Sequence, residues 1–238
     1  MKGKWFRVLS LGAALFGLGT VLLTGGCSSS SAHFRYVQGS PGAPTNVDVE
    51  INSKTVLTNI AYGQTGSYQS TSSGSHQVQI FETGTTTNPV FSGSVTFNSG
   101  YTTLITENFF SQIALAPYTV DNSLPTSGNI RLRTINAAPS AGTVDVYVVT
   151  PPGNGITGIS PNISALAYQQ ASGDVGSKSY LSIPAGSYDI VFTQTGTQNI
   201  ISQLSNQAFT AGQVRTVLML DFSSGGAPFD NLVLADLN

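Results

Sequence analysis

The chain has 238 residues, enough for one or two domains. Hydrophobic residues make up 40% of it and charged residues only 8%, which allows a packed core and excludes both intrinsic disorder and long, charge-rich helices. Three of the nine basic residues lie in the first seven positions, which leaves six against 11 acidic residues. Because no Lys/Arg run remains, nucleic acid is excluded as a partner.

The first residues have the pattern of an export signal. Lys2, Lys4 and Arg7 form a positive segment, and residues 8–23 follow without a charge. This uncharged stretch has the length of a signal-peptide core and is short for a membrane-spanning helix. It is followed by Cys27, the only cysteine of the chain.

A lone cysteine that follows small residues at the end of such a stretch resembles a bacterial lipobox. The resemblance implies that residues 1–26 are a signal peptide that is removed and that Cys27 carries a lipid. Residues 27–33 are then a Ser-rich tether. Thr24 stands where a lipobox prefers an aliphatic residue, so an uncleaved membrane anchor is the alternative. Ser28 after the cysteine, rather than Asp, indicates sorting to the outer membrane of the bacterial cell envelope.

The rest of the chain contains an internal repeat. Five motifs of its first half recur in the same order in its second half: Arg35–Pro44 with Arg133–Gly142, Val47–Val49 with Val144–Val146, Ile60–Tyr62 with Leu166–Tyr168, Gly74–Ile80 with Gly186–Phe192, and Phe97–Gly100 with Phe209–Gly212. A turn-rich linker at residues 121–128 separates them. We therefore predict two domains, residues 34–126 and 127–238, each of an ordinary domain size.

Hydrophobic residues alternate with polar ones within each copy. Val47, Val49 and Ile51 alternate with Asp48 and Glu50, which predicts a strand with one face in a core. The pattern places the side chains of Val49, Ile80, Val146 and Phe192 in the cores. Turn signals separate many such short runs, so the fold class is all-β with two tandem immunoglobulin-like β-sandwiches.

The ordered series of motifs resembles the bacterial domain-of-unknown-function family numbered 4397, in two copies over residues 34–238. It consists of an Arg-containing strand ending at a proline, then Val-Asp-Val, Ala-Tyr, Gly-Ser before a strand, and Phe-x-x-Gly. The resemblance implies an immunoglobulin-like β-sandwich that is exported. It implies no established activity.

Catalytic residues are not expected. His33 falls in the predicted tether, and His76 falls on a strand where it is expected to face solvent. Asp48 and Glu50 point to one face and are the best pair of acids for glycoside hydrolysis. The competing interpretation is that Asp48 and its repeat Asp145 keep the strand soluble or hydrogen-bond a neighbouring loop. We predict that the protein is not an enzyme.

Metal ions and cofactors are not expected either. The sequence has no His/Cys cluster for zinc. Residues 221–231 lack the acid spacing of a calcium loop and favour a Gly-rich turn capped by Asp221.

Longer connections in the second copy are the candidate ligand-binding segments, because added loops on a sandwich often carry binding. Their hydrogen-bonding candidates are Asn154, Gln169, Gln170 and Asp174. We predict a non-enzymatic, lipid-anchored envelope protein that is a structural or recognition module. Its partners would be the membrane, through the lipid, and an envelope protein or a glycan. The alternatives are a polysaccharide-acting enzyme that uses Asp48 and Glu50, and an accessory subunit of a surface assembly joined through a strand edge.

Overall fold

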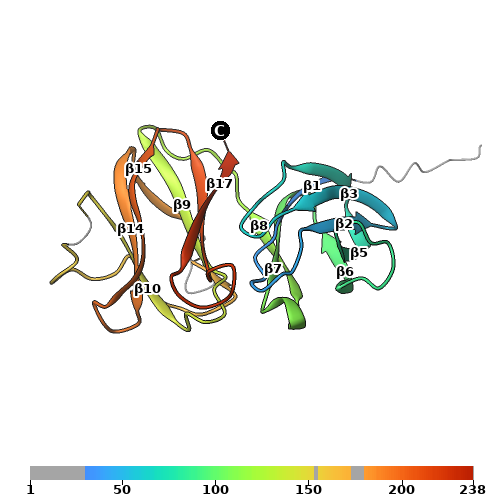
Figure 1. Ribbon diagram of the computed structural model, residues 1–238. Coiled ribbons are helices and arrows are strands. Elements are labelled where there is room, and N and C mark those ends of the chain that lie inside the picture. Colours follow the sequence, from blue (N-terminus) through green and yellow to red (C-terminus); the bar gives the residue numbers. More distant parts are fainter. Residues whose placement is uncertain (1–29, 153–154, 173–179, 238) are drawn as a thin grey trace, which may run out of the picture.

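The computed structural model describes residues 30–152, 155–172 and 180–237, so the signal segment, Cys27, Asn154 and Asp174 lie outside the described residues. The described chain is all-β apart from one short 3₁₀ helix, Phe110–Gln112. Four sheets form two β-sandwiches that lie side by side (Figure 1). The arrangement is compatible with an immunoglobulin-like fold, as the alternating pattern predicts.

The first sandwich has two four-stranded sheets. Sheet A has the strand order β4-β1-β7-β8, and sheet B has the order β3-β2-β5-β6. The strands are β1 (Ser31–Val37), β2 (Val47–Ile51), β3 (Lys54–Ile60), β4 (Gln69–Ser72), β5 (Gly74–Glu82), β6 (Phe91–Phe97), β7 (Gly100–Glu107) and β8 (Ala114–Val120).

The second sandwich follows after residues 121–128, which contain no strand. Sheet C has the order β12-β9-β16-β17, with β13 also paired to β9, and sheet D has the order β11-β10-β14-β15. The strands are β9 (Asn129–Asn136), β10 (Val144–Val149), β11 (Ile163–Leu166), β12 (Gln170–Ala171), β13 (Leu181–Pro184), β14 (Gly186–Gln194), β15 (Ile200–Phe209), β16 (Val214–Leu220) and β17 (Asp230–Leu237).

The two sandwiches share one strand order. In each, the first strand pairs in parallel with the next-to-last strand, β1 with β7 and β9 with β16, and all other ladders are antiparallel. Register makes Thr103 equivalent to Thr216, because Arg35 pairs with the former and Arg133 with the latter. This equivalence allows the two halves to be compared residue by residue.

Each sandwich has its own hydrophobic core. Val49 and Ile80 are fully buried between sheets A and B, and Val146 and Phe192 are fully buried between sheets C and D. The predicted inward positions of these four side chains are confirmed. The cause is the period of two, which puts every second residue of β2, β5, β10 and β14 on the inner face of its sheet.

Replacing Phe192 by Ala should lower the free energy of unfolding by about 3–5 kcal/mol, because a fully buried aromatic ring leaves a cavity that the packed core cannot close. Urea denaturation of the full chain measures this change. Thr197→Ala, on the exposed turn after β14, is the control and should stay within about 0.5 kcal/mol. Equal losses in the two variants would contradict the assigned core.

The sheets stack in the order B, A, C, D (Figure 1). A third hydrophobic cluster lies between sheets A and C and joins the two sandwiches; it contains Val37, Ile105, Tyr118, Ile135, Ala137, Ala171, Leu218, Leu220 and Leu234. Strands β7 and β16 are therefore buried on both faces, and most of their residues are apolar or Thr. A strand buried on one face only would alternate.

The expectations for the two histidines differ from the structure. The strand β1 begins at Ser31, so His33 is not in a tether; its ring stacks on Tyr101 with 4.7 Å between centroids. His76 does not face solvent but is buried, where its Nδ1 lies 2.9 Å from Asn52 Nδ2 and its Nε2 lies 2.9 Å from the Ser72 carbonyl. Each ring has a partner on another strand, Tyr101 on β7 for His33 and Ser72 on β4 for His76.

The outer face of sheet D is also covered. Asp145 and Tyr147, which alternate with the inward-facing valines of β10, are buried as well. Ile156, in the connection between β10 and β11, packs with Tyr147 and Val191 in a small separate cluster. In the ranges that the structure describes, no helix has both the length and the apolar character needed to cross a bilayer.

Candidate binding cavity between the two sandwiches

Two equivalent arginines connect the sandwiches. Arg35 on β1 donates through Nε to Thr103 Oγ1 (2.9 Å) and through Nη1 to the Ala235 carbonyl of β17 (2.7 Å). Arg133 on β9 donates through Nε to Thr216 Oγ1 (3.1 Å) and through Nη1 to the Thr119 carbonyl of β8 (2.6 Å). Each arginine thus binds the last strand of the opposite sandwich.

The symmetry of this pair is broken at the second terminal nitrogen. Arg35 Nη2 forms a buried ion pair with Asp236, which also accepts hydrogen bonds from Thr216 Oγ1 (2.6 Å) and Tyr180 Oη (2.7 Å). Asp236 is the extra residue of a β-bulge in β17, whereas β8 pairs with β7 without a register shift. Arg133 therefore has no equivalent carboxylate, and its Nη2 is buried without a hydrogen-bond partner in the described part of the chain.

The repeated tyrosines of the Ala-Tyr motif cross between the sandwiches in the same way. Tyr62 donates its hydroxyl proton to the Asp221 carbonyl of the second sandwich (2.6 Å). Tyr168 accepts from the Asn108 backbone N–H of the first sandwich (2.6 Å) and donates to Asn108 Oδ1 (2.9 Å). Two of the five motifs that define the repeat thus provide contacts between its two copies.

A carboxyl group replaces a leucine on one side of this interface. Strand register makes Glu107 at the end of β7 equivalent to Leu220, and Tyr118 on β8 equivalent to Leu234. The two leucines are buried in the cluster between the sandwiches. Glu107 is only 1% exposed, and its Oε1 accepts a hydrogen bond from Tyr118 Oη at 2.5 Å. A buried carboxyl therefore stands where the other half is apolar.

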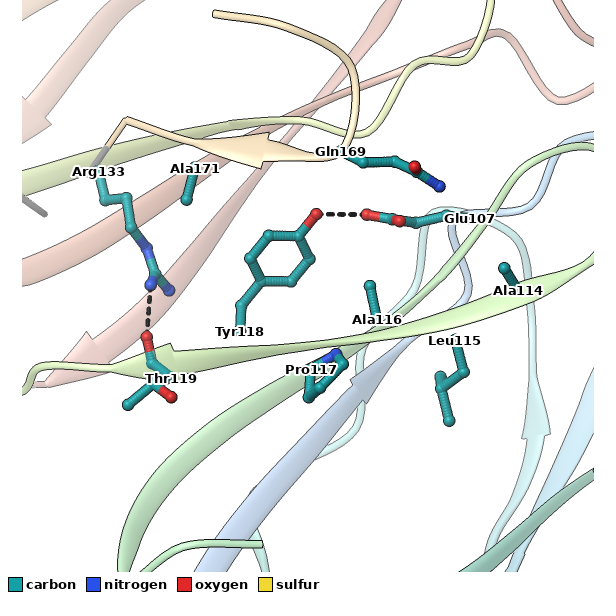
Figure 2. A pocket seen from close by; sticks show the side chains of 10 residues that line it. All are labelled: Glu107, Ala114, Leu115, Ala116, Pro117, Tyr118, Thr119, Arg133, Gln169 and Ala171. Carbon is teal, nitrogen blue, oxygen red and sulfur yellow. Dashed lines mark hydrogen bonds between the residues drawn. The ribbon is translucent and has the colours of Figure 1, made fainter. Parts of the chain in front are cut away.

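A cavity of about 630 Å³ opens beside this carboxyl. Its walls include residues 114–119 of β8, with Glu107 and Gln169 on one side and Arg133 and Ala171 on the other. Figure 2 shows Tyr118 in the middle, with the Arg133 guanidinium and the Glu107 carboxyl on opposite sides of its ring. The volume lies within the range of about 300–1,000 Å³ that is usual for small-molecule sites.

Burial controls the protonation of the carboxyl. It raises the pKa of Glu107 to about 7, because the charged form loses hydration, although the hydrogen bonds from Tyr118 and Gln169 act in the opposite direction. Burial likewise raises the pKa of Tyr168 to about 12, so this phenol stays neutral beside Glu107. Glu107 can therefore take up or release a proton near neutral pH, and as an anion it would attract a positively charged group.

The acids considered for catalysis have structural partners instead. Asp48 Oδ1 accepts hydrogen bonds from the Asn59 N–H (2.7 Å) and Thr83 Oγ1 (2.8 Å). Asp145 accepts from the Ala165 N–H and the Gly196 N–H, both at 2.8 Å. The repeated Asp thus holds a neighbouring strand, β3 or β11, and a turn in each sandwich, which includes the loop-binding role that the sequence analysis left open. Glu50 accepts a hydrogen bond from Thr55 Oγ1 at 3.1 Å.

The predicted ligand-binding residues do not form one group. Gln169 lines the cavity, and its backbone has a positive φ of 64°. Gln170 begins β12, and its Oε1 accepts from the Ala167 N–H (3.3 Å). Ile156, in the connection that contains Asn154, packs on sheet D. The two longer connections therefore lie at opposite sheets of the second sandwich.

Sequence reasoning missed Glu107, Tyr118 and Arg133 as site residues. A signal was present for Glu107, because the repeat aligns an acid with a leucine. Asp221 was expected to cap a Gly-rich turn, and it does so by accepting from the Gly226 N–H (2.9 Å). Among the described residues, no three His, Cys, Asp or Glu side chains are placed to hold a metal ion.

Residues 32–147 match the family model of a domain of unknown function, DUF4397. The resemblance stated from the sequence is thus confirmed for one copy. The match covers the first sandwich and continues through β9 into β10. A search of curated proteins gave no match.

Two solved structures show weak similarity. A leucine-rich repeat protein from Bacteroides thetaiotaomicron VPI-5482 is 14% identical over 79% of this chain and 26% of its own length, with a TM-score of 0.19. The TIE protein of Bacillus anthracis is 8% identical over 87% of this chain and 44% of its own length, with a TM-score of 0.24. The chain thus spans less than half of either protein, and neither likeness bears on function.

Proposed function

We propose that the protein is a non-enzymatic recognition module of the bacterial cell envelope. It consists of two tandem DUF4397 domains on a lipid anchor, and it binds a small polar ligand in the cavity between them. The observation that carries the binding role is the buried polar lining of this cavity: Glu107 and Tyr118 stand where the other half has Leu220 and Leu234. A carboxyl in such a place lowers stability, which favours a role in binding.

The second copy of the family domain is supported by the matching strand order of the two sandwiches and by the equivalent contacts of Arg35 with Arg133 and of Tyr62 with Tyr168. The enzyme alternative has less support, because Asp48 is engaged by strand β3 and by the turn after β5 of its own sandwich. The accessory-subunit alternative, in which a partner pairs with a strand edge, also has less support. Pro117 has no N–H group and so interrupts the row of donors along the edge strand β8.

The lipid anchor predicts a change on replacing Cys27 by Ser. The parent should sediment with membranes and begin at a lipid-modified Cys27, because several acyl chains hold a protein far more firmly than one. The variant should lack the modification and leave the membrane on washing. Fractionation and intact-mass measurement of both proteins test this. A variant that stays as firmly bound as the parent would contradict the anchor and support an uncleaved signal.

The same fractionation, on separated inner and outer membranes, tests the proposed outer-membrane location.

The binding role is tested by the double variant Glu107→Leu/Tyr118→Leu, which gives this side of the interface the residues of the other half. The full chain in detergent is heated with a small-molecule extract of its own cell envelope. We expect the extract to raise the Tm of the parent, because a ligand that binds only the native state stabilises it. The double variant, shown to be folded by circular dichroism, should not respond. Equal shifts in both proteins, or no shift in the parent, would refute the proposal.

A further inference from the structure

Arg133 is a buried cation with an incomplete set of partners. It is 3% exposed, and its guanidinium also lies 4.9 Å from the centre of the Tyr180 ring. The equivalent Arg35 has the same ring contact with Tyr68, at 5.0 Å, and in addition the carboxylate of Asp236. A planar carboxylate is the natural partner of a guanidinium. A ligand carboxylate would give Arg133 what Asp236 gives Arg35.

Glu107 has the opposite deficiency. Its partners are the hydroxyl of Tyr118 and the side chain of Gln169, which are neutral donors. The two ion pairs formed by the described residues are Arg35–Asp236 and Arg131–Asp121, and neither includes Glu107 or Arg133. A buried carboxylate without a cation is costly, so an ammonium group brought by a ligand would be a favourable partner.

The two groups line one cavity and lie on opposite sides of Tyr118 (Figure 2). Between them lie the Tyr118 ring and the apolar side chains of Ala116 and Pro117, in a cavity whose surface as a whole is more polar than apolar. The cavity thus offers a cation at one end, a carboxyl at the other and apolar side chains between. This arrangement matches a molecule that carries a carboxylate and an ammonium group on a short apolar frame.

We propose that the cavity binds a small zwitterion, an amino acid or a short peptide, with its carboxylate on Arg133 and its ammonium group on Glu107. The inference rests on the proposed binding role and adds the chemical class of the ligand. Binding requires Glu107 to be ionised, and the ligand therefore displaces the proton that this carboxyl holds at lower pH.

The sign of the pH dependence distinguishes ligand classes. The charged and titratable groups that face Glu107 are Tyr118 on β8, Tyr168 before β12, with Asp221 behind it, and Arg133 on β9. Tyr168 stays neutral between pH 6 and pH 8. Since the pKa of Glu107 is about 7, its ionised fraction rises about tenfold from pH 6 to pH 8. The α-ammonium group of a short peptide has lost about half of its protons at pH 8, so the affinity for such a zwitterion should rise about fivefold. Affinity for a simple carboxylate should fall, because ionised Glu107 repels it.

Calorimetric titration of the full chain in detergent tests the ligand class with three probes: dialanine, propionate and glucose. Dialanine should bind more tightly than either of the others. Glu107→Gln and Arg133→Lys should each weaken it at least about tenfold at pH 8, because the first removes the negative charge that pairs with the ammonium group and the second removes the planar guanidinium that binds a carboxylate through two N–H groups. Glu107→Gln should also abolish the pH dependence. The matched controls Glu50→Gln and Arg131→Lys, whose side chains lie outside the cavity, should change the affinity less than about twofold.

Each other outcome overturns the inference in a recognisable way. Tighter binding of glucose or propionate, lost in Glu107→Leu/Tyr118→Leu, would preserve the binding role and refute the zwitterion. Dialanine binding that survives both single substitutions would place the zwitterion elsewhere. Failure of dialanine to bind at millimolar concentration would refute this ligand class, and the response to the envelope extract would then decide the binding role separately. Circular dichroism and Tm of every variant separate lost binding from lost folding.

Discussion

Replacing Asp236 by Ala should lower the free energy of unfolding by about 3–5 kcal/mol, the loss expected when one partner of a buried ion pair is removed. The Asp236 side chain is fully buried and that of Arg35 is 4% exposed, so the remaining guanidinium would keep its charge without water. Thr216 and Tyr180 would lose their common acceptor as well. Denaturant unfolding of the full chain at pH 7 measures the effect.

Asp230→Ala is the matched control, because Asp230 is exposed at the start of the same strand. Its cost should stay within about 0.5 kcal/mol. The double variant Arg35→Met/Asp236→Leu should recover most of the loss, since it removes both charges of this pair. If Asp236→Ala were no more costly than Asp230→Ala, the ion pair would not contribute to holding the sandwiches together.

The sandwich fold could be read from the sequence where one face of a strand meets solvent. Val47, Val49 and Ile51 alternate with half-buried polar residues on β2, and the structure has that pattern. Alternation fails on β16, which lies between two layers. It also fails on β10, because Ile156 packs on Tyr147 at the outer face of that strand. The periodicity of one strand reports its own two faces and says nothing of what packs against them.

The repeat was visible in the sequence, but its physical meaning was not. Arg35, Arg133, Tyr62 and Tyr168 were evidence of duplication, and the structure shows that each contacts the opposite copy. A duplicated domain can pack against its own copy through one surface used twice, as in a symmetric dimer. The repeated residues contact the opposite copy because sheet A packs against sheet C. The linear pattern of the sequence does not specify this packing.

The cavity arises where this internal symmetry is broken, which explains why motif searching missed it. Glu107 and Tyr118 belong to no repeated motif; they differ from their equivalents Leu220 and Leu234. The bulge that inserts Asp236 beside Arg35 has no sequence signature either. A comparison of the two copies for differences, rather than for identities, would have found the carboxyl.

The same carboxyl should make stability depend on pH in a defined window. The pKa of Glu107 is raised from 4.5 to about 7, so between these values the folded state holds a proton that the unfolded state releases. Stability from this group is therefore complete below pH 4.5 and declines as pH rises to about 7, by a total of about 3 kcal/mol. Above pH 7 the charged carboxylate is buried in the native state at full cost.

Glu107→Gln should remove this dependence while it keeps the shape of the side chain and an acceptor for Tyr118. The unfolding free energies of parent and variant are measured from pH 4 to pH 8. The parent should lose about 3 kcal/mol of stability relative to the variant as the pH rises from 4.5 to about 7. Acids whose pKa is lowered, such as Asp121 beside Arg131, are present in both proteins and cancel. Glu50→Gln, which replaces a half-buried carboxyl outside the cavity, is the control substitution. A constant difference for Glu107→Gln would mean that this carboxyl titrates as an exposed acid does. The assignment of Glu107 as a buried carboxyl beside the cavity would then be wrong.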